Sequence, residues 1–265
     1  MSNKKTGKVP SFVLYILLFI ILALICVSGY KVYDYFKAQK EAENSVSHLT
    51  ELAVTPAPIP ETETVQEVQK QEALCPISVD FDALHTENKD IIAWLHLPDT
   101  VINYPVLQAD DNSYYLHRLT NGYWNIAGSL FLDCRNDAAF ADPNSVIYGH
   151  NMTNNTMFGT LMDYTRQEYY DKHPHMFIIT PEKTYRLELL AGFVTDTSSE
   201  VYVFPQDEEA TASQLAKWLE ISDFQTVYEY TQGSRLVTLS TCAEDYGNKR
   251  YVVVGALKET KTETE

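Results

Sequence analysis

Cysteine is scarce in this chain, which has 265 residues and only four thiols, at positions 26, 75, 134 and 242. The first thiol lies in an apolar amino-terminal run, so three remain for the rest of the chain. An odd number excludes complete pairing, because a disulfide between Cys75 and Cys134 would still leave one thiol over. The sequence leaves open whether that pair forms. Cys242 is the best candidate for a reactive thiol.

Basic residues are also few. Lysine and arginine number 20 against 36 aspartates and glutamates, and the formal net charge is −16. Nucleic-acid-binding proteins place clustered cations against phosphates, and no RNP, Cys2His2 or helix-turn-helix pattern stands out here. We therefore expect no nucleic-acid partner. The hydrophobic fraction of 45% is ordinary for a folded protein and suffices for one sizeable domain plus an appendage.

Charge is absent altogether from residues 12–30, which read FVLYILLFIILALICVSGY. A run of this length fits a helix that crosses a bilayer. A cleaved signal peptide would have a shorter apolar region, of roughly 7–15 residues, followed by a small-residue cleavage site that CVSGYK matches poorly. Lysines precede the run, so we expect an uncleaved single-pass anchor, with the amino end cytoplasmic and everything after residue 30 extracellular.

The region 31–72 has the composition of a connector. It starts as a possible helical extension, KVYDYFKAQKEAENSVSHLTEL, and continues with Pro56, Pro58 and Pro60 among small, acidic and amide residues. This is typical of an extended, solvated stalk. The predicted organisation is a basic tail (1–11), an anchor (12–30), a stalk (31–72), a folded domain (73–258) and a polar tail (259–265).

Strand-type residues dominate the folded part. Short segments rich in Val, Ile, Tyr, Phe and Thr alternate with polar, Gly or Pro breaks, which predicts strands. These segments are 101–107, 129–133, 145–148, 175–180, 184–195, 235–241 and 251–257. One or two short amphipathic helices are expected within 79–98, and further helices at 157–170 and 207–222. Many short strands with few helices predict a β-barrel or β-sandwich decorated by helices.

The stretch TLSTCAEDYGNKR, residues 238–250, raises a chemical question. A strand delivers Cys242 to a polar turn, and the turn at Gly247 and Asn248 would return a second strand that carries Arg250 close to the thiol. A nearby cation favours the thiolate, which is the nucleophilic form. A small buried apolar residue is the commoner fate of a free cysteine, and this motif alone leaves both interpretations open.

The segment SVIYGHNMTNNTMFG, residues 145–159, adds a candidate general acid and base. A strand ends at Gly149, and His150 follows at its exit before a loop-type run. Such a position suits proton transfer, although a lone histidine is more often a packing residue. The pattern His173-Pro-His175 lacks further zinc ligands nearby. The histidines without a context of this kind are interpreted as structural; they are His48, His85, His96, His117, His173 and His175.

Together, Cys242, His150 and Arg250 fit one mechanism, in which a thiolate attacks a carbonyl, an imidazole moves protons and a guanidinium stabilises the oxyanion. No aspartate is evident as an orienting third member. Glu244 and Asp245 flank the thiol, and acids raise a thiol pKa, so a cationic partner is needed all the more. Papain-like hydrolases usually place the cysteine before the histidine, and L,D-transpeptidases carry a Gly-rich signature that is missing here.

These residues resemble those of a class B sortase, a membrane-tethered cysteine transpeptidase of Gram-positive bacteria. The resemblance covers roughly residues 81–257 and rests on TLSTC followed by an arginine, on YGHN upstream and on the amino-terminal anchor. The blocks DFDALHTENKDIIAWLHLPDTVINYPVLQADDNSYYLH, GSLFLDCRN and VIYGHNMTNNTMFGTL are similar to those of class B. The resemblance implies a mainly β fold with added helices: a sortase-type β-barrel with amino-terminal helices and a helix, here 207–222, inserted between late strands.

The resemblance also implies roles for individual residues. His150, Cys242 and Arg250 take the catalytic positions: the thiol would cut after a Thr in a sorting signal, the imidazole would protonate the leaving amine, and the guanidinium would bind the oxyanion. The loop 197–204 matches the specificity loop in outline. The positions that match substrate contacts of the family are Asn112, Leu116, Tyr148 and Ser240.

The implied partners are surface proteins with a carboxyl-terminal sorting signal, of the Asn-Pro-x-Thr type or with Ser or Pro first, and a cell-wall precursor that supplies the acceptor amine. No metal or other cofactor is implied. The alternatives are a pilin-polymerising sortase, an extracellular cysteine hydrolase and a non-catalytic binding domain. Two residues depart from the family pattern: Ala243 stands where some class B members have Glu, and Cys134 where an aromatic or small residue is common.

Overall fold

The structure is a computed structural model that describes residues 11–57, 74–203, 207–243 and 249–260, without the side chains of Cys242 and Ala243. Several predicted features therefore lie outside the described residues. They are most of the basic tail, Pro58 and Pro60 of the stalk, Phe204 of the loop 197–204, the turn at Gly247 and Asn248 with the acids before it, and most of the carboxyl-terminal tail.

The first long element is α1 (Ser11–Ala53), a helix of 43 residues. It contains the uncharged run 12–30, and its length and hydropathy suit a helix that crosses a membrane. The chain divides into two compact units, Met1–Glu41 and the residues from Ala42 onward. Ala42, Leu49 and Ala53 are buried in the second unit. The structure thus adds the end of α1 to the range 73–258 expected for the folded domain.

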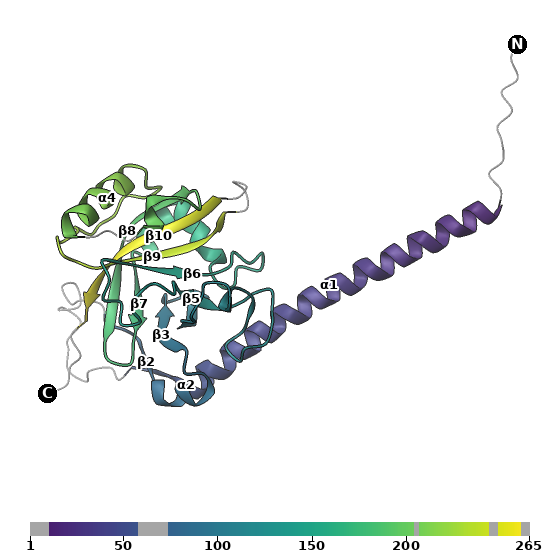
Figure 1. The fold of residues 1–265 in the computed structure, drawn as a ribbon, viewed down its shortest axis with the longest axis horizontal. Helices are drawn as coiled ribbons and strands as arrows, with labels where there is room; N and C mark the ends of the chain where they lie inside the picture. Colours follow the sequence, from purple (N-terminus) through teal and green to yellow (C-terminus); the bar gives the residue numbers. More distant parts are fainter. Residues whose placement is uncertain (1–10, 58–73, 204–206, 244–248, 261–265) are drawn as a thin grey trace, which may run out of the picture. The chain divides into compact units, whose positions relative to one another are not determined.

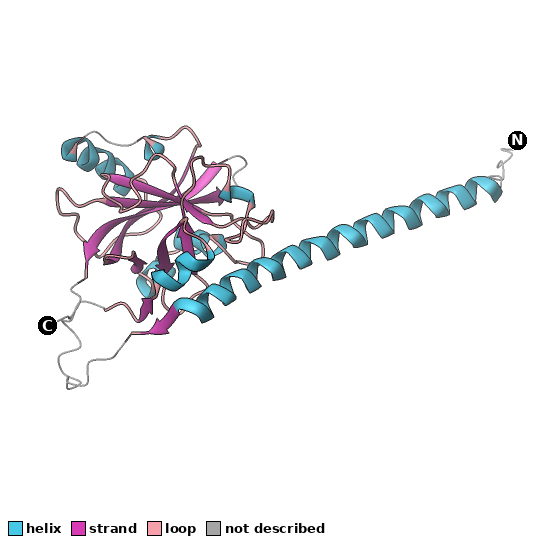
Figure 2. Ribbon diagram, turned by 60° about the horizontal axis from the view of Figure 1, so that its bottom comes forward, coloured by secondary structure: helices cyan, strands magenta, loops and turns pink. Residues whose placement is uncertain are grey.

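Eight strands of the second unit form a closed barrel in the order β10-β8-β7-β3-β4-β5-β6-β9. Figures 1 and 2 show these strands wrapping around a common interior. Most neighbours are antiparallel, whereas β4 with β5 and β6 with β9 are parallel. The strands are β3 (Ile91–His96), β4 (Asn103–Leu107), β5 (Leu130–Leu132), β6 (Asn144–Tyr148), β7 (His175–Ile179), β8 (Thr184–Thr195), β9 (Leu236–Ala243) and β10 (Lys249–Glu259). The predicted barrel decorated by helices is confirmed.

Short elements surround the barrel. A separate two-stranded sheet pairs β1 (Val54–Pro56) with β2 (Ile77–Val79). The helices after α1 are α2 (Phe81–Glu87), η1 (Tyr115–His117), η2 (Gly159–Thr165), α3 (Gln167–Lys172), η3 (Glu200–Tyr202) and α4 (Glu208–Glu220). The helix α4 is the expected insertion between late strands, since it lies between β8 and β9 in the chain.

The start of α4 follows from its first residues. The carboxylate of Asp207 accepts a hydrogen bond from the Ala210 backbone N–H, 2.8 Å away, which satisfies one of the unpaired donors at the helix start. Leu215 and Trp218 are buried in a cluster with residues of β8, β9 and β10. The helix therefore packs its apolar stripe on the outer surface of the barrel.

Two secondary-structure predictions are confirmed only in part, since one short helix lies within 79–98 but no second helix follows it there. Within 79–98 only α2 is helical, and Ile91–His96 is the strand β3. Ala93 and Leu95 belong to the main core cluster, whereas Ile91 and Trp94 belong to the cluster that includes the end of α1. A strand that is covered on both faces shows no alternation of apolar and polar residues, and so resembles a buried helix. The helix expected at 157–170 is split into η2 and α3.

A buried side-chain amide joins three parts of the second unit. Asn144, the first residue of β6, is fully buried. Its Nδ2 donates to the Val201 carbonyl of η3 at 3.1 Å, and its Oδ1 accepts from the Thr238 hydroxyl of β9 at 3.0 Å. Buried polar groups are tolerated when their hydrogen bonds are made. Asn144 thereby anchors the η3 loop to two adjacent strands.

Leu187 of β8 tests the interior packing, because its side chain is fully buried in the main core cluster. We expect Leu187→Ala to lower the free energy of unfolding by about 2–5 kcal/mol, since it deletes buried methyl groups and leaves a cavity. Leu219→Ala is the matched control, because Leu219 on α4 is 41% exposed; its effect should stay near about 0.5 kcal/mol. Denaturant unfolding of the full chain in detergent measures both, and equal losses would contradict this packing.

Candidate active site

Three neighbouring strands, β6, β9 and β10, bring the predicted catalytic positions to one end of the barrel. In the parallel pair β6–β9, Tyr148 lies opposite Ser240. His150 and Cys242 each follow those residues by two positions. In the antiparallel pair β9–β10, Cys242 lies opposite Arg250. The strand register therefore gathers the backbones of His150, Cys242 and Arg250 at the same edge.

Gly149 allows β6 to end close against its neighbours. Its N–H donates to the Ser240 carbonyl of β9 at 3.1 Å, which extends the pairing one residue past the strand. A Cβ atom at this position would clash with the side chains of Leu130 and Phe158. A glycine is therefore required here, and it delivers His150 to the rim of the barrel directly beside β9.

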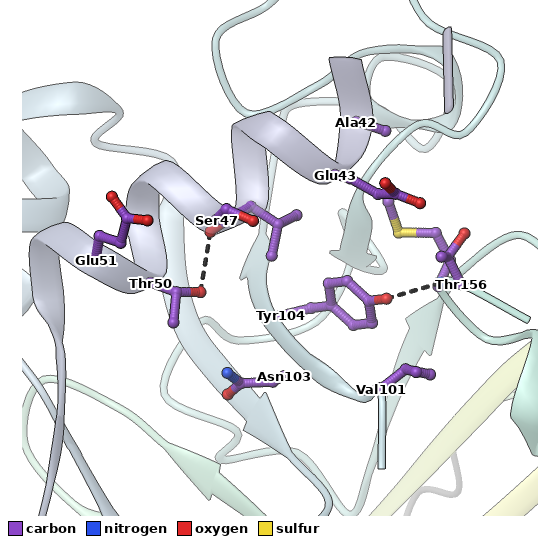
Figure 3. A pocket seen from close by; sticks show the side chains of 11 residues that line it. Ala42, Glu43, Ser47, Thr50, Glu51, Val101, Asn103, Tyr104 and Thr156 are labelled. Atoms are coloured by element: carbon purple, nitrogen blue, oxygen red, sulfur yellow. Dashed lines mark hydrogen bonds between the residues drawn. The ribbon is translucent and has the colours of Figure 1, made fainter. Parts of the chain in front are cut away.

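Hydrogen bonds close the loop after His150 and attach it to Tyr104 of β4. The Phe158 N–H donates to the His150 carbonyl at 2.9 Å, and Asn151 forms a β-bridge with Met157. The Met157 N–H donates to the hydroxyl of Tyr104 at 3.2 Å. Figure 3 shows the Tyr104 side chain directed at this segment from the wall of a pocket of about 390 Å³, with the end of α1 on the opposite side. This arrangement fixes both ends of the loop.

The imidazole of His150 is held by the segment η1. Its Nε2 lies 2.7 Å from the Leu116 carbonyl oxygen. A carbonyl can only accept, so Nε2 carries the proton and Nδ1 is the basic nitrogen. The ring of His117 stacks on that of His150, with centroids 5.3 Å apart and planes 22° apart.

The environment of His150 favours its neutral form. Burial lowers the pKa of His150 below its usual value, and the charges of His117 and Arg250 lower it further, against the opposing effect of the hydrogen bond to Leu116. A neutral imidazole with a free Nδ1 can accept a proton near neutral pH.

Two of the expected substrate-contact residues meet in one small network. The hydroxyl of Tyr202 and the Oγ of Ser240 are 2.8 Å apart. The rings of Tyr148 and Tyr202 are stacked, with centroids 6.2 Å apart. Tyr202 belongs to η3 within the loop 197–204, so this loop reaches the rim beside β6 and β9. Its last residue, Phe204, lies outside the described residues.

An ion pair between the exposed Arg135 and the buried Asp133 supports Tyr148 from the side. The Asp133 carboxylate is fully buried and accepts from the Arg135 Nε and Nη2 at 2.9 and 2.8 Å, and from the Tyr148 hydroxyl at 3.0 Å. Burial acts to raise the pKa of Asp133, but the hydrogen bonds from Arg135 and Tyr148 outweigh it and lower the pKa below its usual value. Two-point pairing of arginine with a carboxylate fixes orientation as well as distance.

The remaining predicted contacts have different surroundings. Leu116 is 37% exposed and touches His150 through its carbonyl group. The Asn112 Oδ1 accepts from the Cys134 N–H at 2.7 Å, so Asn112 is linked to the Tyr148 network through the chain at 133–134. Cys75 and Cys134 are free thiols, not a disulfide. Burial raises the pKa of Cys75 to about 11, which suits a packing residue rather than a nucleophile.

Comparison with known proteins decides the family. The sequence matches the family model described as a sortase domain over residues 95–258. This chain belongs to the sortase family. Sortase B of Listeria monocytogenes is 35% identical over 176 residues, which cover 64% of this chain and 70% of that protein. Sortase B of Staphylococcus aureus is 34% identical over 182 residues, which cover 67% of this chain and 74% of that protein.

Solved structures of sortase B share the fold of this sortase. A Staphylococcus aureus sortase B–substrate complex aligns with a TM-score of 0.64 at 32% identity, over 68% of this chain and 85% of that one. Sortase B from B. anthracis in complex with AAEK1 aligns with a TM-score of 0.70 at 30% identity, over 85% and 100%. A sortase B complexed with triglycine aligns with a TM-score of 0.65 at 32% identity, over 68% and 86%. The protein is a cysteine transpeptidase of the kind that anchors surface proteins.

Sequence reasoning missed three groups that hold the site of this sortase. The Leu116 carbonyl carries no sequence signal, since every residue has one. His117 was set aside as structural, because nothing in the sequence shows that η1 lies beside the loop of His150. The sequence predicts Tyr202 only as part of the loop 197–204. Its aromatic side chain in that loop is the feature that could have identified it. Among the residues that the structure describes, no group of three or more His, Cys, Asp or Glu could hold a metal ion.

The buried carboxylate of Asp133 leads to a pH-dependent prediction. Because its folded-state pKa is lowered, its stabilising effect is present above the unfolded-state pKa of about 3.9 and is lost as the pH falls through the folded-state value. We expect Asp133→Asn to cost about 2 kcal/mol of unfolding free energy at pH 7, and the gap to wild type to narrow below about pH 4. Chemical unfolding of the full chain at several pH values measures this gap.

The control for that experiment is Glu220→Gln, which alters an exposed carboxylate at the end of α4. Its free energy of unfolding should equal that of wild type at every pH, because an exposed carboxylate contributes little to stability. A gap between Asp133→Asn and wild type that stays constant from pH 7 to pH 3 would show that the Asp133–Arg135 pair contributes nothing through its charge.

Proposed function

We propose that Cys242 is the nucleophile of this sortase, that His150 is its general acid and base, and that Arg250 binds the oxyanion. The observation that carries this assignment is the register of two strand pairs, with Tyr148 opposite Ser240 and Cys242 opposite Arg250. The lowered pKa of His150 and the influence of Arg250 on it support the same grouping.

The first half of the reaction forms a thioester. The thiol proton of Cys242 passes to the free Nδ1 of His150, and the sulfur attacks the carbonyl carbon of the Thr in the sorting signal. The resulting oxyanion is stabilised by the guanidinium of Arg250. The carbon–nitrogen bond then breaks, and the proton on Nδ1 moves to the leaving amine.

The second half transfers the acyl group. An amine of a cell-wall precursor gives up a proton to Nδ1 of His150 and attacks the thioester carbonyl. The carbon–sulfur bond breaks, and the sulfur recovers the proton from Nδ1. The surface protein is then joined to the wall through a new amide bond. A Leu116 carbonyl that holds the Nε2 proton keeps Nδ1 available for each of these four transfers.

The sorting signal would bind along the rim next to β6 and β9. The residues that would contact it are Asn112, Leu116, Tyr148 and Ser240, and Tyr202 joins them because its hydroxyl is paired with Ser240. The signal would be of the Asn-Pro-x-Thr type or carry Ser or Pro in its first position. Solved sortase B structures with a substrate and with triglycine support a peptide and an amine as the two ligands.

The proposed topology follows from the amino-terminal part. The apolar run of α1 would be a single membrane anchor with residues 1–11 in the cytoplasm, since Lys4, Lys5 and Lys8 precede it. The residues up to 72 would connect it to an extracellular catalytic domain, 73–258, which the end of α1 extends. This places the thiol where exported surface proteins and wall precursors meet.

The catalytic assignment is tested by turnover of an Asn-Pro-x-Thr-x peptide, with and without an amine acceptor. We expect Cys242→Ala and His150→Ala to abolish turnover, and Arg250→Lys to lose about 100-fold or more, because Lys cannot reproduce the planar guanidinium. Cys134→Ala is the thiol control and should keep its turnover. Wild type should form an acyl-enzyme on Cys242 by mass spectrometry and turn over faster with the amine.

Full turnover by Cys242→Ala would refute the nucleophile. An acyl-enzyme that forms but is released only by water, with no gain from the amine, would instead identify a hydrolase.

The topology is tested on intact cells. We expect a protease added from outside to degrade the catalytic domain, because it lies beyond the membrane, and to leave the amino-terminal tail protected. Immunoblotting with one tag at each end of the chain reads out both fragments. In inverted vesicles the protected end should be reversed. Protection of the carboxyl-terminal tag in intact cells would contradict the proposed orientation.

A further inference from the structure

Three rings form a row that ends on the proposed catalytic imidazole. The ring centroids of Trp124 and His117 are 6.2 Å apart, and those of His117 and His150 are 5.3 Å apart. The turn that carries Trp124 is held to the segment of His117 by the bridge between Arg118 and Trp124. A hydrogen bond of 2.9 Å from the Leu119 N–H to the Tyr123 carbonyl closes the same turn.

We propose that His117, backed by Trp124, is a positioning residue that fixes the ring plane of His150 during transpeptidation. The proposal rests on the role of His150 given above. We expect His117 to act on the reaction only through the neighbouring ring of His150.

The physical need for such a residue follows from the geometry. His150 lies at the exit of β6, where a loop begins, and a histidine side chain has two rotatable bonds. The hydrogen bond from Nε2 to the Leu116 carbonyl holds one atom of the ring but still permits the ring to turn about that contact. A second ring stacked on the face, with planes 22° apart, removes this rotation. The free Nδ1 then keeps one direction.

Trp124 is suited to support the stack. It is 65% exposed, so it does not stabilise the barrel core, yet its ring lies against His117 at an interplanar angle of 35°. His117 is exposed as well. Because Trp124 already covers one face of the exposed His117 ring, ordering that ring against His150 costs less conformational entropy. Through these three rings, the turn 118–125 restricts the motion of the His150 ring.

The stack also brings the charge of a second ring close to His150. The titratable groups that act on His150 are His117 from η1 and Arg250 from β10, and Cys242 of β9 is adjacent by strand register. The charge of His117 lowers the pKa of His150, because a like charge nearby disfavours the protonated form. His150 consequently stays neutral to lower pH than it would beside an uncharged ring.

The kinetic experiment uses the full chain in detergent and the sorting peptide with an amine acceptor. We expect His117→Ala to lower kcat by about 3- to 10-fold, the factor for one lost aromatic contact, with little change in the peptide KM. His117→Phe keeps the stack and should recover most of that loss. Trp124→Ala should lower kcat in the same direction, and adding it to His117→Ala should cost nothing further.

Tyr123→Ala is the matched control, since Tyr123 is 74% exposed on the same turn, and it should leave kcat unchanged. Unfolding midpoints should be the same for all these variants, because each altered side chain is exposed. Wild-type kcat in His117→Ala, or equal losses in His117→Ala and His117→Phe, would overturn the proposal.

An independent measurement follows the His150 ring by NMR as the pH is changed. We expect the pKa of His150 to be higher in His117→Phe than in wild type, because the opposing charge is gone while the stack remains. An unchanged His150 titration would overturn the coupling of the two rings. This readout needs no turnover, so it stands apart from the catalytic assignment, which fails only if Cys242→Ala or His150→Ala stays active.

Discussion

The parallel pairing of β6 with β9 is the constraint on which the site of this sortase depends. Parallel neighbours need a long crossover connection, and here β7, β8 and α4 intervene in the chain between the two strands. His150 and Cys242 therefore become neighbours only when the barrel closes. A shift of that pairing by one residue would turn alternate side chains to the opposite face, and the imidazole and thiol positions would no longer coincide.

The groups that hold His150 come from the main chain and from rings, where many enzymes use a carboxylate. The Leu116 carbonyl selects the tautomer, the His117 ring covers one face, and the Tyr104 hydroxyl holds the loop that follows. A carboxylate beside the imidazole would raise its pKa. Burial and the charges of His117 and Arg250 act in the other direction and favour the neutral form of His150, against the opposing effect of the Leu116 carbonyl, in a protein that is otherwise strongly acidic.

Much of the fold could be predicted from local patterns, because most strands have one segment of β-branched and aromatic residues between clear breaks. The strand 184–195 has the same bounds in the structure. The failure at β3 has a physical reason: Ile91 and Trp94 are covered on one face and Ala93 and Leu95 on the other, so no period-2 pattern survives.

In the site, as in the fold, local sequence patterns predict some features, whereas others depend on contacts between distant parts of the chain. The thiol, imidazole and guanidinium stand out as unusual residues at the ends of predicted strands, so their positions could be proposed from the sequence. The neighbours of His150 could not, since η1 reaches it through barrel closure and one of its contacts is a backbone carbonyl. Burial of Asp133 and its pairing with Arg135 and Tyr148 are likewise products of the tertiary fold.

The amide of Asn144 divides the η3 loop into two faces with different freedom to evolve. The inner face is tied to the barrel through the Val201 carbonyl, a group that every amino acid supplies, and through the buried Val201 side chain and the Tyr202 hydroxyl, which is paired with Ser240. The outer face includes Val203, which is 57% exposed. Side chains there can be exchanged while the loop remains fastened to the barrel, which gives natural variation a route to new peptide preferences at little risk to folding.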